Sequence, residues 1–289
     1  MKDLITPNGF RIGFGTNRLG ALSGRERSRL LSCVWDLGVR HFDTAPLYGG
    51  GDAERWLGEF LATGRQEATV TTKFGLYPAL VQRSRLLRDF ARMARRFSGP
   101  IWKLAGKWIH KPQATVPRPT ATRSPSEYRQ IASGMEAALG VSLGKLRREY
   151  VDVFAIHEPD TGILEADEVL TELVKLRAAG KTKRVAAAGC FHAVFPIAKR
   201  KDTPFDIYQF EHDAAGKNMS QWMEVALPPP ILFGAVAARG TVSPSACGHI
   251  GEAPSALMKS VLEVNLGGLV LFSTTKLTHA EEILLPFAA

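Results

Sequence analysis

Three runs of apolar and β-branched residues end at ionisable side chains, which are Asp43, Lys73 and His157. A tyrosine, Tyr48, follows the first of these runs by five residues and is itself followed by three glycines. Burying a carboxylate at the end of a strand is costly unless a cation lies beside it. The pattern therefore predicts that these strand ends converge on one polar site.

These four residue types suit proton transfer to or from a carbonyl oxygen. A free tyrosine has a pKa near 10 and is a weak acid at pH 7. An adjacent Lys73 ammonium favours the phenolate and is expected to lower the pKa of Tyr48, while Asp43 keeps the lysine charged. His157 can donate a hydrogen bond that orients the carbonyl. None of the four donates hydride, so a reduction at this site requires a nicotinamide.

Each residue also has a structural interpretation when it is taken alone. Asp43 and Lys73 are consistent with a structural ion pair at the end of a barrel. Tyr48 is consistent with an aromatic residue in a turn, and His157 with a hydrogen-bonded core histidine. Their occurrence together, at successive strand ends, favours the catalytic interpretation.

Strands and helices alternate along the chain, with crossovers of the length that parallel strands require. Eight strand–helix units favour a (β/α)8 TIM barrel over an open doubly wound sheet, because no G-x-G-x-x-G motif opens a helix. Besides a short hairpin and first strand within 1–14, strands are predicted at 39–43, 68–74, 151–157, 183–189, 205–210, 231–238 and 268–273. Capping-box spacing predicts helix starts at Ser23 with Glu26, Ser124 with Glu127 and Thr278 with Glu281.

Length and composition predict one domain over residues 1–289. No apolar run approaches the roughly 20 residues of a membrane span, and the first residues do not resemble a secretory signal. The three cysteines lack C-x-x-C spacing, so we expect neither disulfides nor a metal site. A reducing, cytoplasmic location is therefore expected.

Positive charge gathers in an insertion after the third strand, residues 76–123. This segment holds 11 of the 37 Lys and Arg residues but one of the 28 acidic residues. Its apolar and basic spacing predicts an amphipathic helix that forms a lid over the barrel mouth, and attraction of an anionic substrate is an alternative. An anionic membrane surface is a further alternative, whereas no motif indicates nucleic-acid binding. The candidate lid or substrate residues are Arg92, Arg95, Arg96, Trp102 and Trp108.

Beyond this insertion, nearly the whole chain resembles the aldo-keto reductases. The segments GFGTNRLG, HFDTAPLYGGGDAERWLG, VTTKFG and SLGKLRREYVDVFAIHEPD are similar to consecutive signatures of that family, and LVKLRAAGKTKRV and LFSTTKLTHAEEI to later ones. The resemblance implies a barrel that binds NAD(P)H without a Rossmann domain. It also implies a catalytic tetrad, with Tyr48 as the general acid, formed by Asp43, Tyr48, Lys73 and His157.

The same resemblance implies where the cofactor binds. The last loop, residues 273–276, places hydroxyl groups and a cation before a helix, and this arrangement suits a phosphate. The cation, Lys276, favours NADP(H) over NAD(H). An ordinary helix cap is the alternative for this last loop. The implied cofactor-binding residues are Gly15, Thr16, Asp43, Gln209, Ser273, Thr274, Thr275 and Lys276.

Three positions depart from the family pattern. Ala188 and Gly189 stand where the family has Ser-Asn beside the nicotinamide amide, and Gly234 stands where an aromatic ring often stacks on it. Such losses weaken binding by about 1–3 kcal/mol. Two hypotheses follow: an NAD(P)H-dependent oxidoreductase that interconverts an alcohol and an aldehyde, ketone or sugar carbonyl, or a binding or scaffold protein with a degraded cofactor site that acts through 76–123.

Overall fold

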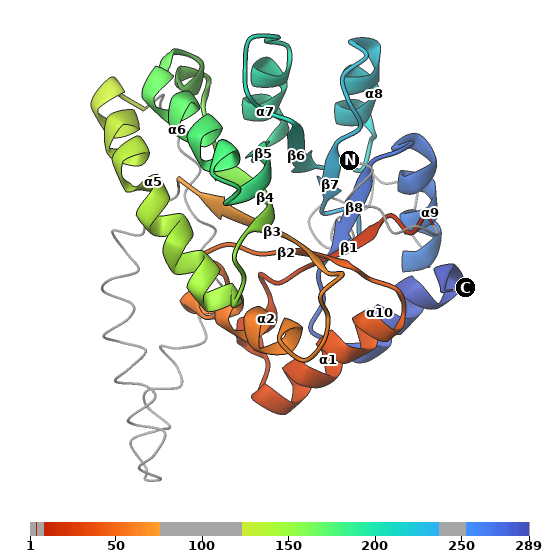
Figure 1. Cartoon of the computed structure of the whole chain (residues 1–289). Coiled ribbons are helices and arrows are strands. Elements are labelled where there is room, and N and C mark those ends of the chain that lie inside the picture. The colour runs from red at the N-terminus through yellow and green to blue at the C-terminus, as the bar shows by residue number, and fades with distance from the viewer. Residues whose placement is uncertain (1–3, 5–8, 76–122, 237–252, 289) are drawn as a thin grey trace, which may run out of the picture.

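The computed structural model describes residues 4, 9–75, 123–236 and 253–288. Within these ranges eight strands form a closed barrel in the order β1 to β8, and each strand is parallel to both neighbours. Helices surround the barrel (Figure 1). The predicted TIM barrel is therefore confirmed. The predicted N-terminal hairpin lies mostly outside the described residues, as does the 76–123 insertion apart from Arg123.

Strand bounds follow the predicted runs closely. The strands are β1 (Ile12–Gly15), β2 (His41–Asp43), β3 (Thr69–Phe74), β4 (Val151–His157), β5 (Thr182–Ala188), β6 (Ile207–Glu211), β7 (Ile231–Phe233) and β8 (Leu269–Phe272). Strand β7 is shorter than the predicted strand over residues 231–238. Gly234 has φ 82°, and this left-handed conformation ends the extended backbone of β7.

Helices follow most of the strands. Their bounds are α1 (Gly24–Asp36), α2 (Ala53–Leu61), α5 (Pro125–Leu146), α6 (Asp167–Ala178), α7 (Phe191–Ala198), α8 (Lys217–Glu224), α9 (Pro254–Val264) and α10 (Leu277–Leu284). Short 3-10 turns include η2 (Leu19–Ala21) and η3 (Tyr48–Gly51).

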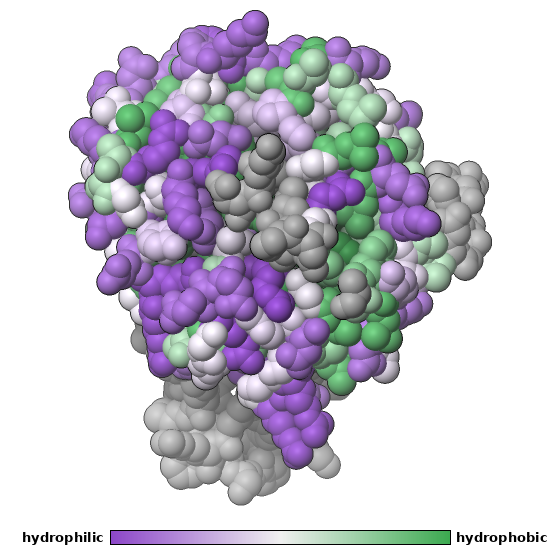
Figure 2. Space-filling view, turned by 45° about the vertical axis from the view of Figure 1, so that its right-hand side comes forward, coloured by the Kyte–Doolittle hydropathy of each residue, from purple (hydrophilic) through white to green (hydrophobic). Residues whose placement is uncertain are grey.

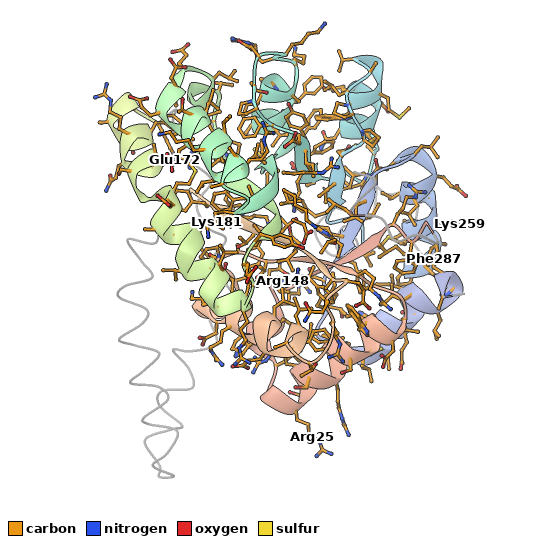
Figure 3. All side chains as sticks on the ribbon, in the orientation of Figure 1. Arg25, Arg148, Glu172, Lys181, Lys259 and Phe287 are labelled. Atoms are coloured by element: carbon orange, nitrogen blue, oxygen red, sulfur yellow. The ribbon has the colours of Figure 1, made fainter. Side chains whose placement is uncertain are left out.

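The side chains of each strand alternate between two cores, as the period of two requires. Val153 and Ala155 of β4 belong to the cluster inside the barrel. Phe154 and Ile156 belong to the larger cluster that includes the buried faces of the helices. His157 continues the inward series of Val153 and Ala155, so alternation directs it toward the barrel mouth. Figure 3 shows side chains filling both spaces.

Two of the three predicted capping boxes are present, at Ser23 with Glu26 and at Ser124 with Glu127. The prediction for Thr278 is wrong, because α10 begins at Leu277 and Lys276 is its N-cap. The Lys276 N–H instead donates to Thr274 Oγ1 at 3.0 Å. This bond closes the loop before the helix, which places Thr278 inside the first turn.

The outer surface is mainly hydrophilic. Figure 2 shows purple side chains over much of one face and a green, apolar area on its right-hand side. Exposed apolar side chains include Leu266 and Leu285, at 74% and 57% exposure. Among the described residues, no helix combines the length and the apolar character that crossing a membrane requires.

Candidate active site

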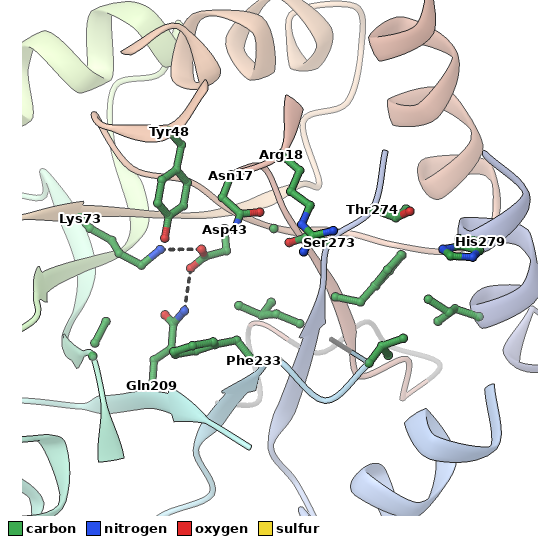
Figure 4. A pocket seen from close by; sticks show the side chains of 18 of the residues that line it. Asn17, Arg18, Asp43, Tyr48, Lys73, Gln209, Phe233, Ser273, Thr274 and His279 are labelled. Carbon is green, nitrogen blue, oxygen red and sulfur yellow. Dashed lines mark hydrogen bonds and ion pairs between the residues drawn. The ribbon is translucent and has the colours of Figure 1, made fainter. Parts of the chain in front are cut away.

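A buried ion pair lies at the barrel mouth, where β2 and β3 end. Lys73 Nζ donates to Asp43 Oδ1 at 2.5 Å and to the Thr44 carbonyl oxygen at 3.1 Å. Gln209 Nε2, from β6 across the barrel, donates to Asp43 Oδ2 at 3.1 Å (Figure 4). The Lys73 and Asp43 side chains are 2% and 5% exposed. The pair is thus fixed in place by further hydrogen bonds, as a buried pair requires.

Tyr48 reaches the ion pair from the η3 turn. Its hydroxyl points toward the Lys73 ammonium (Figure 4), and Lys73 Nζ lies 4.9 Å from the centre of the phenol ring. The rings of Tyr48 and His157 meet edge to face, with centroids 6.0 Å apart. Gly49 and Gly50 have φ of 59° and 70°, which allow the turn that follows the tyrosine. The structure therefore brings all four predicted catalytic residues together.

Burial changes the protonation behaviour of this group. Burial raises the pKa of Tyr48 above its ordinary value, and the Lys73 ammonium opposes this without reversing it. The net direction is opposite to the expected lowering, because desolvation of the phenolate outweighs the attraction of the cation. Burial lowers the pKa of Lys73, but the Asp43 carboxylate and Tyr48 outweigh that effect and raise it.

His157 is held neutral. Burial, followed by the nearby charges of Lys73 and Arg123, lowers the pKa of His157 to about 3. At neutral pH the site therefore combines a neutral phenol, a charged lysine and a neutral imidazole. A neutral imidazole keeps one N–H donor, and a protonated phenol is a second donor. This combination is suited to binding and protonating a carbonyl oxygen.

The four side chains line one cavity of about 610 Å³, which extends from them to the loop after β8. Two features of its wall suit a dinucleotide. Gln209 Oε1 is buried and has no hydrogen-bond partner among the described residues, so an amide N–H would satisfy it. Ser273 and Thr274 add hydroxyls from the loop after β8. A Cβ at Gly15 would collide with Ser273 Oγ, so a larger residue there would turn the serine hydroxyl out of its present position.

The predicted cofactor residues divide into two groups. Gly15, Asp43, Gln209, Ser273 and Thr274 line the cavity. Three do not line it in the part of the chain that is described, namely Thr16, Thr275 and Lys276.

Thr16 has a supporting position instead, because its hydroxyl donates to the Asp43 carbonyl oxygen at 3.1 Å and bonds to Thr44 Oγ1 at 2.9 Å. Lys276 is an exposed N-cap residue. The part of the chain that the structure describes does not include the predicted lid residues Arg92, Arg95, Arg96, Trp102 and Trp108.

The cavity is also lined by residues that were not predicted from the sequence. Arg18, Glu158, His279 and Glu282 line it. Glu158 directly follows β4 and Arg18 lies three residues after the end of β1, and these positions after strand ends are the signal that could have identified them. Ala188, Gly189 and Gly234 line the same cavity, so the departures from the family pattern do lie at the site.

The model of the aldo/keto reductase family matches residues 11–224. D-threo-aldose 1-dehydrogenase from Pseudomonas sp is 31% identical over 181 residues, which are 60% of this chain and 48% of that protein. L-galactose dehydrogenase from Arabidopsis thaliana is 24% identical over 187 residues, which are 62% of this chain and 44% of that protein. The chain thus matches less than half the length of these relatives.

Solved structures resemble the whole barrel. An aldo-keto reductase from Bacillus halodurans, in a holo form, has a TM-score of 0.65 at 16% identity, covering 96% of this chain and 87% of that one. An aldo-keto reductase from Klebsiella pneumoniae in complex with NADPH has a TM-score of 0.58 at 17% identity, covering 96% and 84%. At these identities the likeness concerns the fold.

Proposed function

The chain belongs to the aldo/keto reductase family, and from that premise we propose that it interconverts a carbonyl and an alcohol with a nicotinamide cofactor. The substrate is proposed to be a small aldehyde, ketone or sugar. The names of two relatives, an aldose and a galactose dehydrogenase, support the sugar class. The proposal depends on one observation, which is that one cavity is lined by Tyr48, Lys73, Asp43 and His157.

Tyr48 is proposed as the general acid and base. In the reducing direction its hydroxyl gives a proton to the carbonyl oxygen, and the Lys73 ammonium stabilises the phenolate that remains. Asp43 keeps the ammonium in position through the 2.5 Å contact. The neutral imidazole of His157 donates to the same carbonyl oxygen and orients it. When bound, the nicotinamide supplies the hydride for reduction or accepts it in oxidation.

NADP(H) is the proposed cofactor, in preference to NAD(H). Ser273 and Thr274 line the cavity from the loop after β8, and Lys276 follows them at the start of α10. Hydroxyls and a cation at a helix start suit a phosphate. Gln209 Oε1, buried without a partner among the described residues, supports a bound amide at the inner end.

Replacing Tyr48 by Phe tests the function directly. NADPH binding, followed by fluorescence titration, is expected to remain, while turnover of an aldehyde or aldose panel falls by about 10²- to 10⁴-fold. Tyr208→Phe is the matched control, because Tyr208 is buried but is not among the described residues that line the cavity. Full turnover in Tyr48→Phe would contradict the assignment. A wild-type protein that binds neither NADPH nor NADH would favour the alternative of a binding or scaffold protein.

A further inference from the structure

Two hydrogen-bond acceptors line the inner wall of the cavity on either side of β5. Ala188 of β5 pairs with His157 of β4 and with Gln209 of β6. The residue after His157 is Glu158, which lines the cavity, as does Gln209. Gln209 is 3% exposed, its Nε2 is bonded to Asp43, and its Oε1 has no partner among the described residues. A buried acceptor of this kind requires a donor from a ligand or water.

Glu158 is held across the end of β5 by its backbone. Its φ is 50°, a left-handed conformation that non-glycine residues seldom adopt. The Glu158 N–H donates to the Ala188 carbonyl oxygen at 2.7 Å, and Glu158 Oε2 accepts from the Cys190 N–H at 3.2 Å. The carboxylate is therefore fixed beside Ala188 and Gly189.

Gly189 makes room for this carboxylate. A Cβ at position 189 would lie 2.9 Å from Glu158 Oε2 and 3.1 Å from Glu158 Cα. The Glu158 carboxylate thus occupies the space that a side chain at 189 would take. Because Gly189 has no side chain, the Glu158 carboxylate, which follows β4, can place a hydrogen-bond acceptor at the end of β5. Ala188 and Gly189 offer no polar side chain there.

We propose that Glu158 and Gln209 Oε1 together accept the two hydrogens of the carboxamide NH2 of a bound nicotinamide, which makes Glu158 a positioning residue for the cofactor ring. The inference rests on the proposed function, because it requires a nicotinamide in this cavity. A primary amide offers two N–H donors, and a carboxylate is a strong acceptor for one of them. A ligand with a carboxylate in place of the amide would instead be repelled by Glu158.

The test measures binding of three oxidised nucleotides by calorimetry, without turnover. They are NADP+, its 3-acetylpyridine analogue, in which CH3 replaces NH2, and its nicotinic acid analogue, in which a carboxylate replaces the amide. Wild type should bind NADP+ at least about tenfold more tightly than the acetylpyridine analogue. Glu158→Leu should lose most of this preference by weakening NADP+ alone. Glu158→Gln should bind the nicotinic acid analogue about tenfold more tightly than wild type, a gain that misfolding cannot produce.

Glu211→Leu is the matched control. Glu211 Oε2 accepts from the Phe191 N–H at 2.8 Å, as Glu158 Oε2 does from the neighbouring Cys190 N–H, but Glu211 is not among the described residues that line the cavity. It should keep the wild-type preference, whereas Gly189→Ala, which displaces the Glu158 carboxylate, should lose it.

Undiminished preference in Glu158→Leu, or none in wild type, would overturn this inference and leave the proposed function standing. Failure of wild type to bind any of the three nucleotides would overturn both.

Discussion

Lys73 Nζ lies 2.5 Å from Asp43 Oδ1, and both side chains are almost completely buried. Desolvation makes such a pair expensive, and its further hydrogen bonds to Thr44 and Gln209 offset part of that cost. The pair is better explained by its effect on Tyr48 than by stability. It holds a cation beside a phenol whose proton is proposed to move.

Removing one member of this pair should be strongly destabilising, because it leaves an unpaired buried charge. Lys73→Met and Asp43→Asn are each expected to lower the free energy of unfolding by about 3–5 kcal/mol, measured by urea denaturation. The double variant should lose less than the sum of the single losses. Arg200→Met, which breaks an exposed ion pair with Asp202, is the control and should leave stability nearly unchanged. Additive losses would show that the two charges do not depend on each other.

The raised pKa of Tyr48 predicts the pH dependence of alcohol oxidation. In that direction the phenolate is the proposed base, and its fraction rises with pH up to the pKa. Because burial raises that pKa above its ordinary value of 10, kcat for oxidation should still be rising at pH 9. Lys73→Met removes the opposing cation and should move the profile to higher pH, whereas Lys73→Arg should move it less. A wild-type profile that is level from pH 7 to 9 would contradict this assignment.

The fold could be predicted because the strands of a barrel can be recognised in the local sequence from the alternation of their side chains. Alternation in the predicted runs 68–74 and 151–157 indicated the inward faces, and these runs match β3 and β4 closely. The error at the start of α10 arose where another local hydrogen bond takes the place of the predicted capping box. Thr278 has capping-box spacing with Glu281, but the bond from Lys276 to Thr274 sets the start of α10.

The candidate site could be predicted only in part. Asp43, Lys73 and His157 are identified by their positions at strand ends. The direction of the pKa change in Tyr48 was not accessible, because it depends on burial that spacing alone does not reveal. Glu158 was missed because its proposed role depends on a backbone conformation and on the missing side chain of Gly189, which directly follows the next strand, β5.

Acid should destabilise the protein through His41, which lies inside the barrel at 1% exposure between Thr69 and Thr71. Burial lowers the pKa of His41 from 6.5 to about 4. Between these values the unfolded chain binds more protons, so stability is retained above pH 6.5 and falls as the pH drops toward 4. The loss from this residue is about 3 kcal/mol over that range.

Urea denaturation at pH 7 and pH 4.5 checks this, with His41→Gln as the test variant. The variant should lose about 2 kcal/mol less stability than wild type between the two pH values, because glutamine does not titrate. His157, whose pKa is also lowered, contributes a similar loss to both proteins and therefore cancels. Equal losses in wild type and variant would show that folding does not shift the pKa of His41.

Lys276 should determine the choice between NADPH and NADH, because only NADPH carries a second phosphate on its adenosine ribose. The lysine is exposed at the N-cap of α10, beside the hydroxyls that line the cavity end. Lys276→Met is expected to weaken NADPH about five- to tenfold and to leave NADH unchanged, with dissociation constants measured by fluorescence titration. Lys259→Met is the control, since Lys259 points outward from α9 (Figure 3). Equal weakening of both nucleotides would instead assign Lys276 to the phosphates that they share. Because the lysine is exposed, the preference for NADPH should also shrink as salt is raised toward 1 M.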